Sequence, residues 1–188
     1  MEIRIYDSQI GFLTNNEEEF INSPNNETAI AVLKQTEVLY NDNSGCNTEY
    51  CDEHDIKYHK GKINTIGTGV MTSGSLVLTV KRRTELSKNC LSDDFSAALC
   101  QYFKDKNLSS VRQDNNDVLV DDYKVASGGE IMINNFKYMG YQISVNQDIE
   151  AIDNICLRKS LKQPKALSDY GITTEEMVDF CKNYWNNN

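Results

Sequence analysis

Residues 116–141 read NDVLVDDYKVASGGEIMINNFKYMGY, and this stretch decides the fold that we expect. Its runs of branched and aromatic residues are typical of β-strands, and the pair Asn134-Asn135 is typical of a tight hairpin turn. Because the breaks between the runs are short, neighbouring strands should be antiparallel. The sequence predicts strands at 117–120, 123–125, 130–133 and 136–145.

The sequence before and after this stretch contains both strand and helix patterns. Residues 75–80 alternate as in a strand, and an apolar stripe at helical spacing runs from Phe95 to Phe103. Thr173 and Glu176 have the spacing of a capping box at the start of a last helix. Strands and helices mix without strict alternation, which favours an α+β fold, a largely antiparallel mixed sheet with packed helices. We also expect a strand at 2–6, a helix at 27–34 after Pro24, and a short strand at 37–40.

The overall composition is that of an ordinary globular chain. With 188 residues we expect a single domain over 1–188, and the net charge of −9 argues against a nucleic-acid partner. No apolar segment approaches the length of a membrane span, and no signal-peptide pattern opens the chain, so we expect no membrane partner and a cytoplasmic location. Nothing directs the six cysteines to an oxidising compartment, and we expect free thiols.

Lys124 is the first candidate for chemistry. It follows an Asn116-Asp117 pair, an apolar strand and an acidic turn. A fixed ammonium at such a point can stabilise the anionic phosphorus centre through which a carboxylate is joined to AMP. The run resembles the NDhhVxxxKhSG motif (h, apolar) of the lipoate protein ligases, in a superfamily shared with biotin protein ligases and octanoyltransferases.

This resemblance implies a class II synthetase-like fold and assigns roles to individual residues. Lys124 would contact the acyl carbonyl and the α-phosphate of an acyl adenylate. Asn116 and Asp117 would hold the nucleotide and its Mg²⁺, with Asp117 as the metal ligand. The KhSG end of the motif is Lys124 followed by Val125, Ala126, Ser127 and Gly128 here, so Ser127 and Gly128 fall at the binding site.

Three further matches follow the order of the family along the chain. CDEHDI, at residues 51–56, resembles the end of the family's first helix, and LSDYGITTEEM, at 167–177, resembles its closing segment. The third match is glycine-rich and resembles the family's GGGAV, where backbone amides approach the ligand. It consists of Gly67, Thr68, Gly69 and Val70.

The glycine-rich segment also departs from the family. Where the family has RRxSGGG, residues 62–68 read KINTIGT, so that only Lys62 remains as a candidate phosphate contact. A lysine cannot make the bidentate contact of an arginine. Thr72 stands where the family has a histidine.

The resemblance implies ATP and Mg²⁺ as cofactors, lipoate or octanoate as substrate, and an acceptor protein whose lysine receives the acyl group. Two alternatives stay open. The chain could be a catalytically degenerate relative that binds a ligand or partner, as the departures at 62–68 suggest. It could also be an octanoyltransferase with Cys156 as nucleophile, because those relatives use a cysteine downstream of an equivalent hairpin. Ile149, Ile152 and Ile155 form a helical stripe with Cys156, which instead favours a packing role for the thiol.

Both histidines lie close to two cysteines, which raises the question of a zinc site. Cys46, Cys51, His54 and His59 fall within fourteen residues of sequence. Only two residues separate the cysteine pair from the histidine pair, whereas a zinc finger has a long segment there. The spacing therefore favours ordinary packing over zinc.

Overall fold

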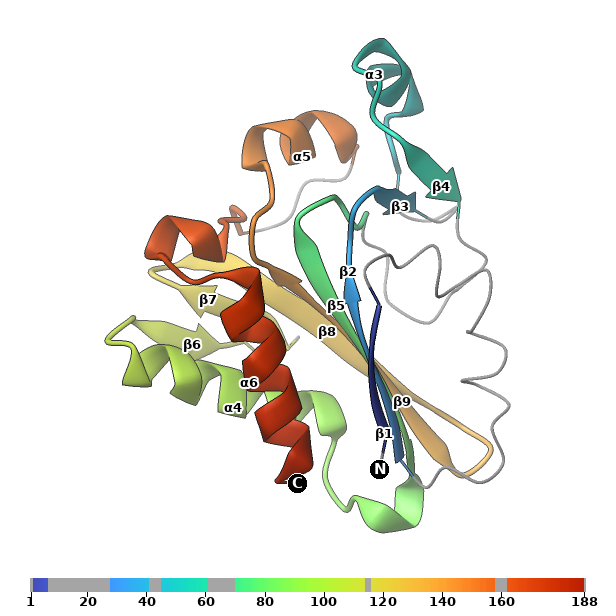
Figure 1. Cartoon of the computed structure of the whole chain (residues 1–188), viewed down its shortest axis with the longest axis vertical. Helices are drawn as coiled ribbons and strands as arrows, with labels where there is room; N and C mark the ends of the chain where they lie inside the picture. Colours follow the sequence, from blue (N-terminus) through green and yellow to red (C-terminus); the bar gives the residue numbers. More distant parts are fainter. Residues whose placement is uncertain are drawn as a thin grey trace.

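A computed structural model of the chain describes residues 2–6, 28–40, 45–60, 70–113, 116–157 and 162–187. Within them, a seven-stranded sheet forms the centre of the molecule (Figure 1). Neighbouring strands are antiparallel except the first pair, which is parallel. The expected α+β class is confirmed. In spatial order the strands are β1 (Glu2–Tyr6), β2 (Thr28–Lys34), β5 (Ser75–Arg83), β9 (Phe136–Ser144), β8 (Tyr123–Ile133), β7 (Val118–Val120) and β6 (Ser110–Arg112).

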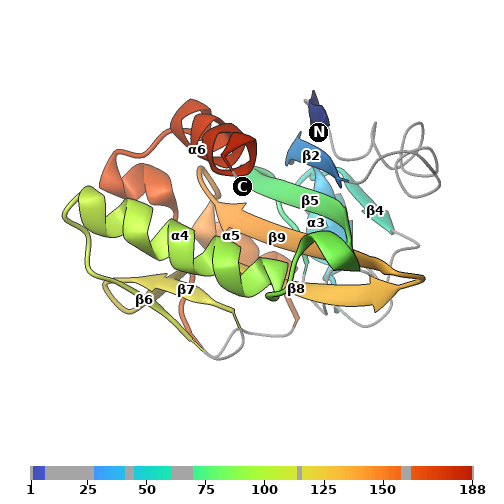
Figure 2. The same cartoon turned by 90° about the horizontal axis from the view of Figure 1, so that it is seen from below.

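Two long helices, α4 (Leu91–Asp105) and α6 (Thr174–Asn186), lie on the same side of the sheet (Figures 1 and 2). Their apolar stripes and the facing strand residues form the main core. Phe95 is central to it: its ring meets the Tyr141 ring edge-on at 5.1 Å and stacks 6.3 Å from the Trp185 ring. The core thus attaches both helices to β9.

The other face of the sheet has a smaller apolar cluster of Ala29, Ala31, Leu33, Met71 and Val77. At the upper end of the sheet in Figure 1, a third cluster forms around helices α3 (Thr48–Glu53) and α5 (Ile149–Ile155). A parallel pair of short strands, β3 (Val38–Tyr40) and β4 (Tyr58–Lys60), adjoins it. Two 3₁₀ turns, η1 (Thr84–Leu86) and η2 (Leu167–Tyr170), complete the described elements.

The expected helix at 27–34 is wrong, because this segment forms strand β2. It lies between β1 and β5, and both of its faces are covered. Ile30 and Val32 enter the main core, whereas Ala29, Ala31 and Leu33 enter the cluster on the other face. A strand buried on both faces is a continuous apolar run, and such a run does not differ in periodicity from a short buried helix.

The meander is confirmed with one correction. The two strands expected at 123–125 and 130–133 are one continuous strand, β8, which pairs with β9 through Gly128 and Gly129. Glycine is usually a strand breaker, but here it allows a close approach between strands. Asn134 and Asn135 have φ values of 47° and 65°, which confirms the tight hairpin.

The start of α6 is also confirmed. The side chain of Thr173 accepts a hydrogen bond from the backbone of Glu176, and the Glu176 carboxylate accepts one from the backbone of Thr173. Across the described ranges, we find no helix that is both long and apolar enough to cross a bilayer.

Candidate functional site

Lys124 and Asp117 form an ion pair at one end of the meander. The Lys124 Nζ lies 2.9 Å from the Asp117 Oδ1, and the two side chains are 25% and 9% exposed. Lys124 pairs with Leu119 in the sheet, whereas Val118 pairs with Ala126 and both face the main core. The register shifts between Val118 and Leu119, which point to opposite faces of β7, so Lys124 lies opposite Leu119 and not on the face of Ala126. Lys124 therefore lies on the face away from α4 and α6. The ammonium is therefore held in a fixed position, partly open to solvent.

The backbone of Lys124 is held from both sides. Its N–H donates to the carbonyl of Gln163 at 2.9 Å, and its carbonyl accepts from the N–H of Lys165 at 3.0 Å. This short parallel bridge, centred on Pro164, continues the sheet beside β8. The Lys165 ammonium lies over the rings of Tyr123 and Tyr170, at 4.9 and 4.4 Å from their centroids, which stabilises the segment further.

Asn116 adopts a left-handed backbone conformation, with φ of 62°, which asparagine tolerates better than most residues. Its side-chain Nδ2 donates to the Ser92 Oγ at 3.1 Å, and its carbonyl accepts from the Tyr141 hydroxyl. Burial raises the pKa of Tyr141, so this hydroxyl stays protonated and donates. The Oδ1 of Asn116 is buried and meets no hydrogen-bond donor among the described residues. A buried acceptor without a partner marks a place where a ligand donor would be favourable.

Gly128 supports this arrangement through Tyr141. A Cβ at Gly128 would lie 2.2 Å from the Tyr141 ring carbon Cδ2 and 2.4 Å from the Gly140 carbonyl. Only glycine fits at position 128 without displacing its neighbours. The Tyr141 ring that packs against it carries the hydroxyl that donates to the Asn116 carbonyl. Ser127 pairs with Gln142 and, next to the core-facing Ala126, lies on the opposite face, where the register shift also places Lys124.

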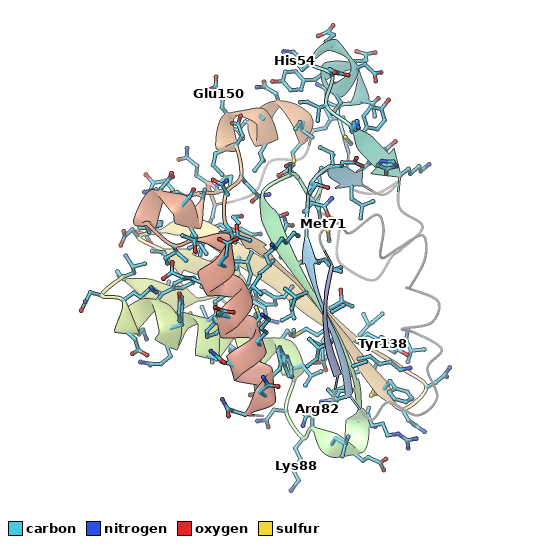
Figure 3. The ribbon with its side chains drawn as sticks, viewed as in Figure 1. His54, Met71, Arg82, Lys88, Tyr138 and Glu150 are labelled. Carbon is cyan, nitrogen blue, oxygen red and sulfur yellow. The ribbon has the colours of Figure 1, made fainter. Side chains whose placement is uncertain are left out.

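Most of the glycine-rich segment lies outside the described residues, namely Gly67, Thr68 and Gly69. Lys62 lies outside them too. Val70 is described, and it packs against the cluster around α3 and α5. Thr72 is buried and accepts a hydrogen bond from the Gln147 side chain. Met71, labelled in Figure 3, belongs to the apolar cluster on the face of the sheet opposite α4 and α6. The described end of the segment therefore lies against that face of the sheet.

Cys156 follows the last residue of α5 and lies beside Cys46. No described lysine is among the groups that affect the pKa of its thiol. Burial, with a smaller contribution from Asp153, raises the pKa of Cys156 to about 11. An acyl nucleophile needs the opposite shift. The environment of Cys156 thus disfavours the role of an acyl nucleophile.

The two histidines have other partners. The His54 ring stacks on Tyr50 and lies 2.9 Å from the carbonyl of Tyr50, and His59 Nε2 lies 2.7 Å from a carboxylate oxygen of Glu37. Within the described ranges, no three metal-binding side chains come together.

Sequence reasoning missed several residues that build the site. Ser92, at the start of α4, and Gln163 to Lys165 contact Asn116 and Lys124 from distant parts of the chain. No local pattern marks a serine in a helix as a partner of an asparagine 24 residues later. Tyr141 could have been found, because a tyrosine opposite a glycine in a hairpin often packs over it.

Comparisons with known proteins were made at the level of sequence and structure. No protein-family model matches the sequence, and the comparison with curated proteins returned no match. Solved structures do match, over nearly the whole chain. This chain has the fold of the lipoate and biotin protein ligases.

Three ligase structures illustrate the match. Lipoate-protein ligase A bound with ATP superposes with a TM-score of 0.74 at 13% identity, over 96% of this chain and 82% of its own. The bipartite ligase of Thermoplasma acidophilum gives 0.71 at 13% identity, over 96% and 80%. LipL1 of P. falciparum, in complex with lipoate, gives 0.70 at 17% identity over 99% of this chain. The chain spans only 63% of the length of LipL1.

Proposed function

We propose that the chain is a lipoate ligase-like acyltransferase. It would join lipoate or a medium-chain acid to AMP and pass the acyl group to a lysine of an acceptor protein. The observation that carries the proposal is the position of Lys124: its ammonium lies 2.9 Å from the Asp117 carboxylate, on the face of a ligase-type sheet opposite α4 and α6. Lys124 also stands at the lysine of the resembled motif.

The proposed chemistry has two half-reactions. In the first, a carboxylate oxygen of the acid attacks the α-phosphorus of ATP, and pyrophosphate leaves. In the second, the neutral amine of the acceptor lysine attacks the acyl carbonyl, AMP leaves, and the nitrogen loses a proton. Negative charge develops on oxygens near Lys124 in both steps. A fixed ammonium there stabilises both transition states more than it stabilises the ground states.

Asp117 and Asn116 would bind the nucleotide side of the site. Mg²⁺ in phosphate sites takes one or two carboxylates with phosphate oxygens and waters, so a single carboxylate such as Asp117 fits it. The metal would supply charge neutralisation at the phosphates. The unpaired Oδ1 of Asn116 offers an acceptor for a donor of the nucleotide. Gly67, Thr68, Gly69, Val70, Ser127, Gly128 and Lys62 remain proposed binding residues.

The comparisons support these proposals at the level of fold. One of the similar structures has ATP bound, another has lipoate bound, and the Thermoplasma acidophilum ligase is described with its lipoyl domain. We extend these properties to the present chain as proposals: ATP and lipoate as ligands, and a protein domain as acceptor. A single domain over 1–188, a cytoplasmic location and the lack of a nucleic-acid or membrane partner are proposed with them.

A second candidate is a non-catalytic relative that binds a ligand or partner. It is favoured by the sequence KINTIGT at 62–68, where the arginines of the resembled motif are missing. The thioester route through Cys156 is less favoured, because the raised pKa of that thiol disfavours its thiolate.

Acyl-AMP formation tests the proposal. The chain is incubated with ATP, Mg²⁺ and either lipoate or octanoate, and the acyl adenylate is sought by mass spectrometry. We expect the adenylate from the wild type and a loss of about 10²- to 10³-fold in Lys124→Ala, the usual cost of removing one stabilising group. Lys182→Ala, at an exposed Lys182–Asp179 pair, is the matched control. If neither acid gives an adenylate but one raises the melting temperature, the non-catalytic candidate is correct.

A further inference from the structure

Helices α3 and α5 lie at one end of the molecule (Figure 1), and three cysteines belong to these helices or border them. Cys51 is buried in α3, Cys46 lies just before that helix, and Cys156 is the residue that ends α5. Cys156 lies more than 100 residues further along the sequence than the other two. The proposed acyl transfer uses none of them.

The backbone places Cys46 directly opposite Cys156 in a short antiparallel bridge. The N–H of Asn47 donates to the carbonyl of Ile155 at 2.8 Å, and the N–H of Leu157 donates to the carbonyl of Gly45 at 2.8 Å. These two bonds flank the cysteines on either side, which makes Cys46 and Cys156 a non-hydrogen-bonded pair. In such a pair the Cα atoms lie about 4.5 Å apart and the side chains are closest.

That spacing falls within the range required for a disulfide. Disulfide-bonded cysteines have Cα atoms about 4.4 to 6.8 Å apart. The Asn47 side chain also donates to the carbonyl of Asn154, at 3.2 Å, so the two segments are held together by a third bond. A disulfide between Cys46 and Cys156 would therefore link two segments that are already held together by backbone and side-chain hydrogen bonds.

The three thiols also interact through their side chains. A hydrogen bond links the thiols of Cys46 and Cys51. Burial is the main cause that raises the pKa of Cys46, and the nearby thiols of Cys51 and Cys156 add to the rise. Cys46 is therefore the central thiol, with Cys156 across the bridge and Cys51 within its own segment. Cys46 and Cys156 are both partly exposed, so a small oxidant can reach them.

We propose that Cys46 and Cys156 are a thiol oxidation site that closes reversibly into a cross-strand disulfide. With hydrogen peroxide as oxidant, one thiol loses its proton, and the thiolate attacks a peroxide oxygen and becomes a sulfenic acid; the hydroxide that leaves takes up a proton and becomes water. The second thiol attacks the sulfenic sulfur, the disulfide forms, and a second water leaves. Two thiols lose two electrons and two protons in total, and a dithiol reagent reverses the change.

The surroundings of the pair determine its rate of oxidation. Burial is the main reason why the pKa of Cys46 is raised to about 12 and the pKa of Cys156 to about 11. Because the thiolate is the attacking species, disulfide formation should be slow near neutral pH and should accelerate as the pH rises toward 11. The pair thus stays reduced under mild conditions.

The closed form should stabilise the fold. The disulfide would link residues about 110 positions apart, and long closed loops restrict the unfolded chain most. We expect the melting temperature of the oxidised chain to rise by about 5 °C or more, and to return on reduction.

Peptide mapping of the full chain tests the proposal directly. The chain is treated with hydrogen peroxide, free thiols are blocked, and the protein is digested with trypsin without reduction. Cys46 and Cys51 fall in the peptide 35–57, whereas Cys156 falls in the peptide 138–158. A Cys46–Cys156 disulfide joins the two peptides, while a Cys46–Cys51 disulfide stays inside one. Fragment spectra then identify the linked sulfurs.

Variants separate the two thiols of the first peptide. We expect the joined peptides in the wild type, in Cys51→Ala and in the control Cys90→Ser, and their loss in Cys46→Ser. The proposal is overturned if oxidation gives only the internal Cys46–Cys51 bond, only unlinked oxidised cysteines, or a link that disappears in Cys51→Ala. The wild-type spectra decide the matter even if a variant fails to fold.

Discussion

Adding one methyl group at Gly128 should displace the ring of Tyr141 and disturb the site from a distance. The added Cβ would lie 2.2 Å from the ring carbon Cδ2 and 2.4 Å from the carbonyl oxygen of Gly140. Non-bonded carbons pack at about 3.5 to 4.0 Å, so the ring or the strand must retreat by more than about 1 Å. The ring cannot move freely, because it is buried against Phe95 and its hydroxyl binds Asn116.

The expected cost of Gly128→Ala follows from this geometry. Forcing a methyl group into a packed core costs about 1 to 3 kcal/mol, and for a chain of this size each kcal/mol lowers the melting temperature by about 2 to 4 °C. We therefore expect a fall of about 2 to 12 °C, measured by circular dichroism or calorimetry. Adenylate formation should fall too, because Asn116 and Asp117 would shift with Tyr141.

The neighbouring glycine provides the matched control. A Cβ at Gly129 meets no atom within 4 Å, although both glycines lie in the same strand. Alanine also loses less conformational freedom on folding than glycine, so Gly129→Ala should leave the melting temperature unchanged or raise it slightly. Equal melting temperatures for the two variants would refute the argument that Gly128 is required by its contact with Tyr141.

Three further predictions concern single contacts. Asp117→Asn leaves the Lys124 ammonium without its counter-charge and should destabilise the fold by about 1 to 3 kcal/mol in urea titration, whereas loss of an exposed pair costs under about 1 kcal/mol. Thr173→Ala removes the capping box of α6 and should cost about 1 kcal/mol, seen as a melting temperature lower by about 2 to 4 °C; an unchanged value would contradict it. The hydrogen bond from Lys106 lowers the pKa of Glu176 below its usual 4.5, so Glu176 stabilises the fold above that pH and loses this effect as the pH falls through its lowered value. Glu176→Gln should therefore flatten the acid limb of the stability profile, and Glu175→Gln, at the next position of α6, should not.

The sequence predicted the meander well because its signals are local. Asn134 and Asn135 adopt the positive φ angles that a tight hairpin needs, and the Thr173–Glu176 pair forms the expected capping box. In each case neighbouring residues alone determine the conformation. The order of the central strands followed from the same hairpins.

The predictions were wrong where contacts with residues distant in sequence determine the local structure. Residues 28–34 became a strand because β1, β5 and two apolar clusters surround them, and nothing in the segment itself reveals those neighbours. The glycines of β8 interrupted the expected strand, although Gly128 is needed there by the ring of Tyr141. Local patterns contain no information on such contacts.

The candidate site likewise contains contacts between residues close in sequence and contacts between residues far apart. Lys124 and Asp117 lie seven residues apart, and the strand and turn between them bring their side chains together. Ser92 and the segment 163–165 reach the site only through the folded sheet. The cross-strand pair Cys46 and Cys156 is likewise invisible in the sequence, because the bridge that aligns them joins two loops.

The central claim is that Lys124 stabilises an acyl adenylate, and the yield of that adenylate tests it most directly. Wild type, Lys124→Ala and Lys182→Ala are each incubated with ATP, Mg²⁺ and lipoate or octanoate, and acyl-AMP is quantified by mass spectrometry. Our account predicts acyl-AMP from the wild type and Lys182→Ala, and about 10²- to 10³-fold less from Lys124→Ala. Equal yields from the wild type and Lys124→Ala, or no acyl-AMP from the folded wild type, would contradict it.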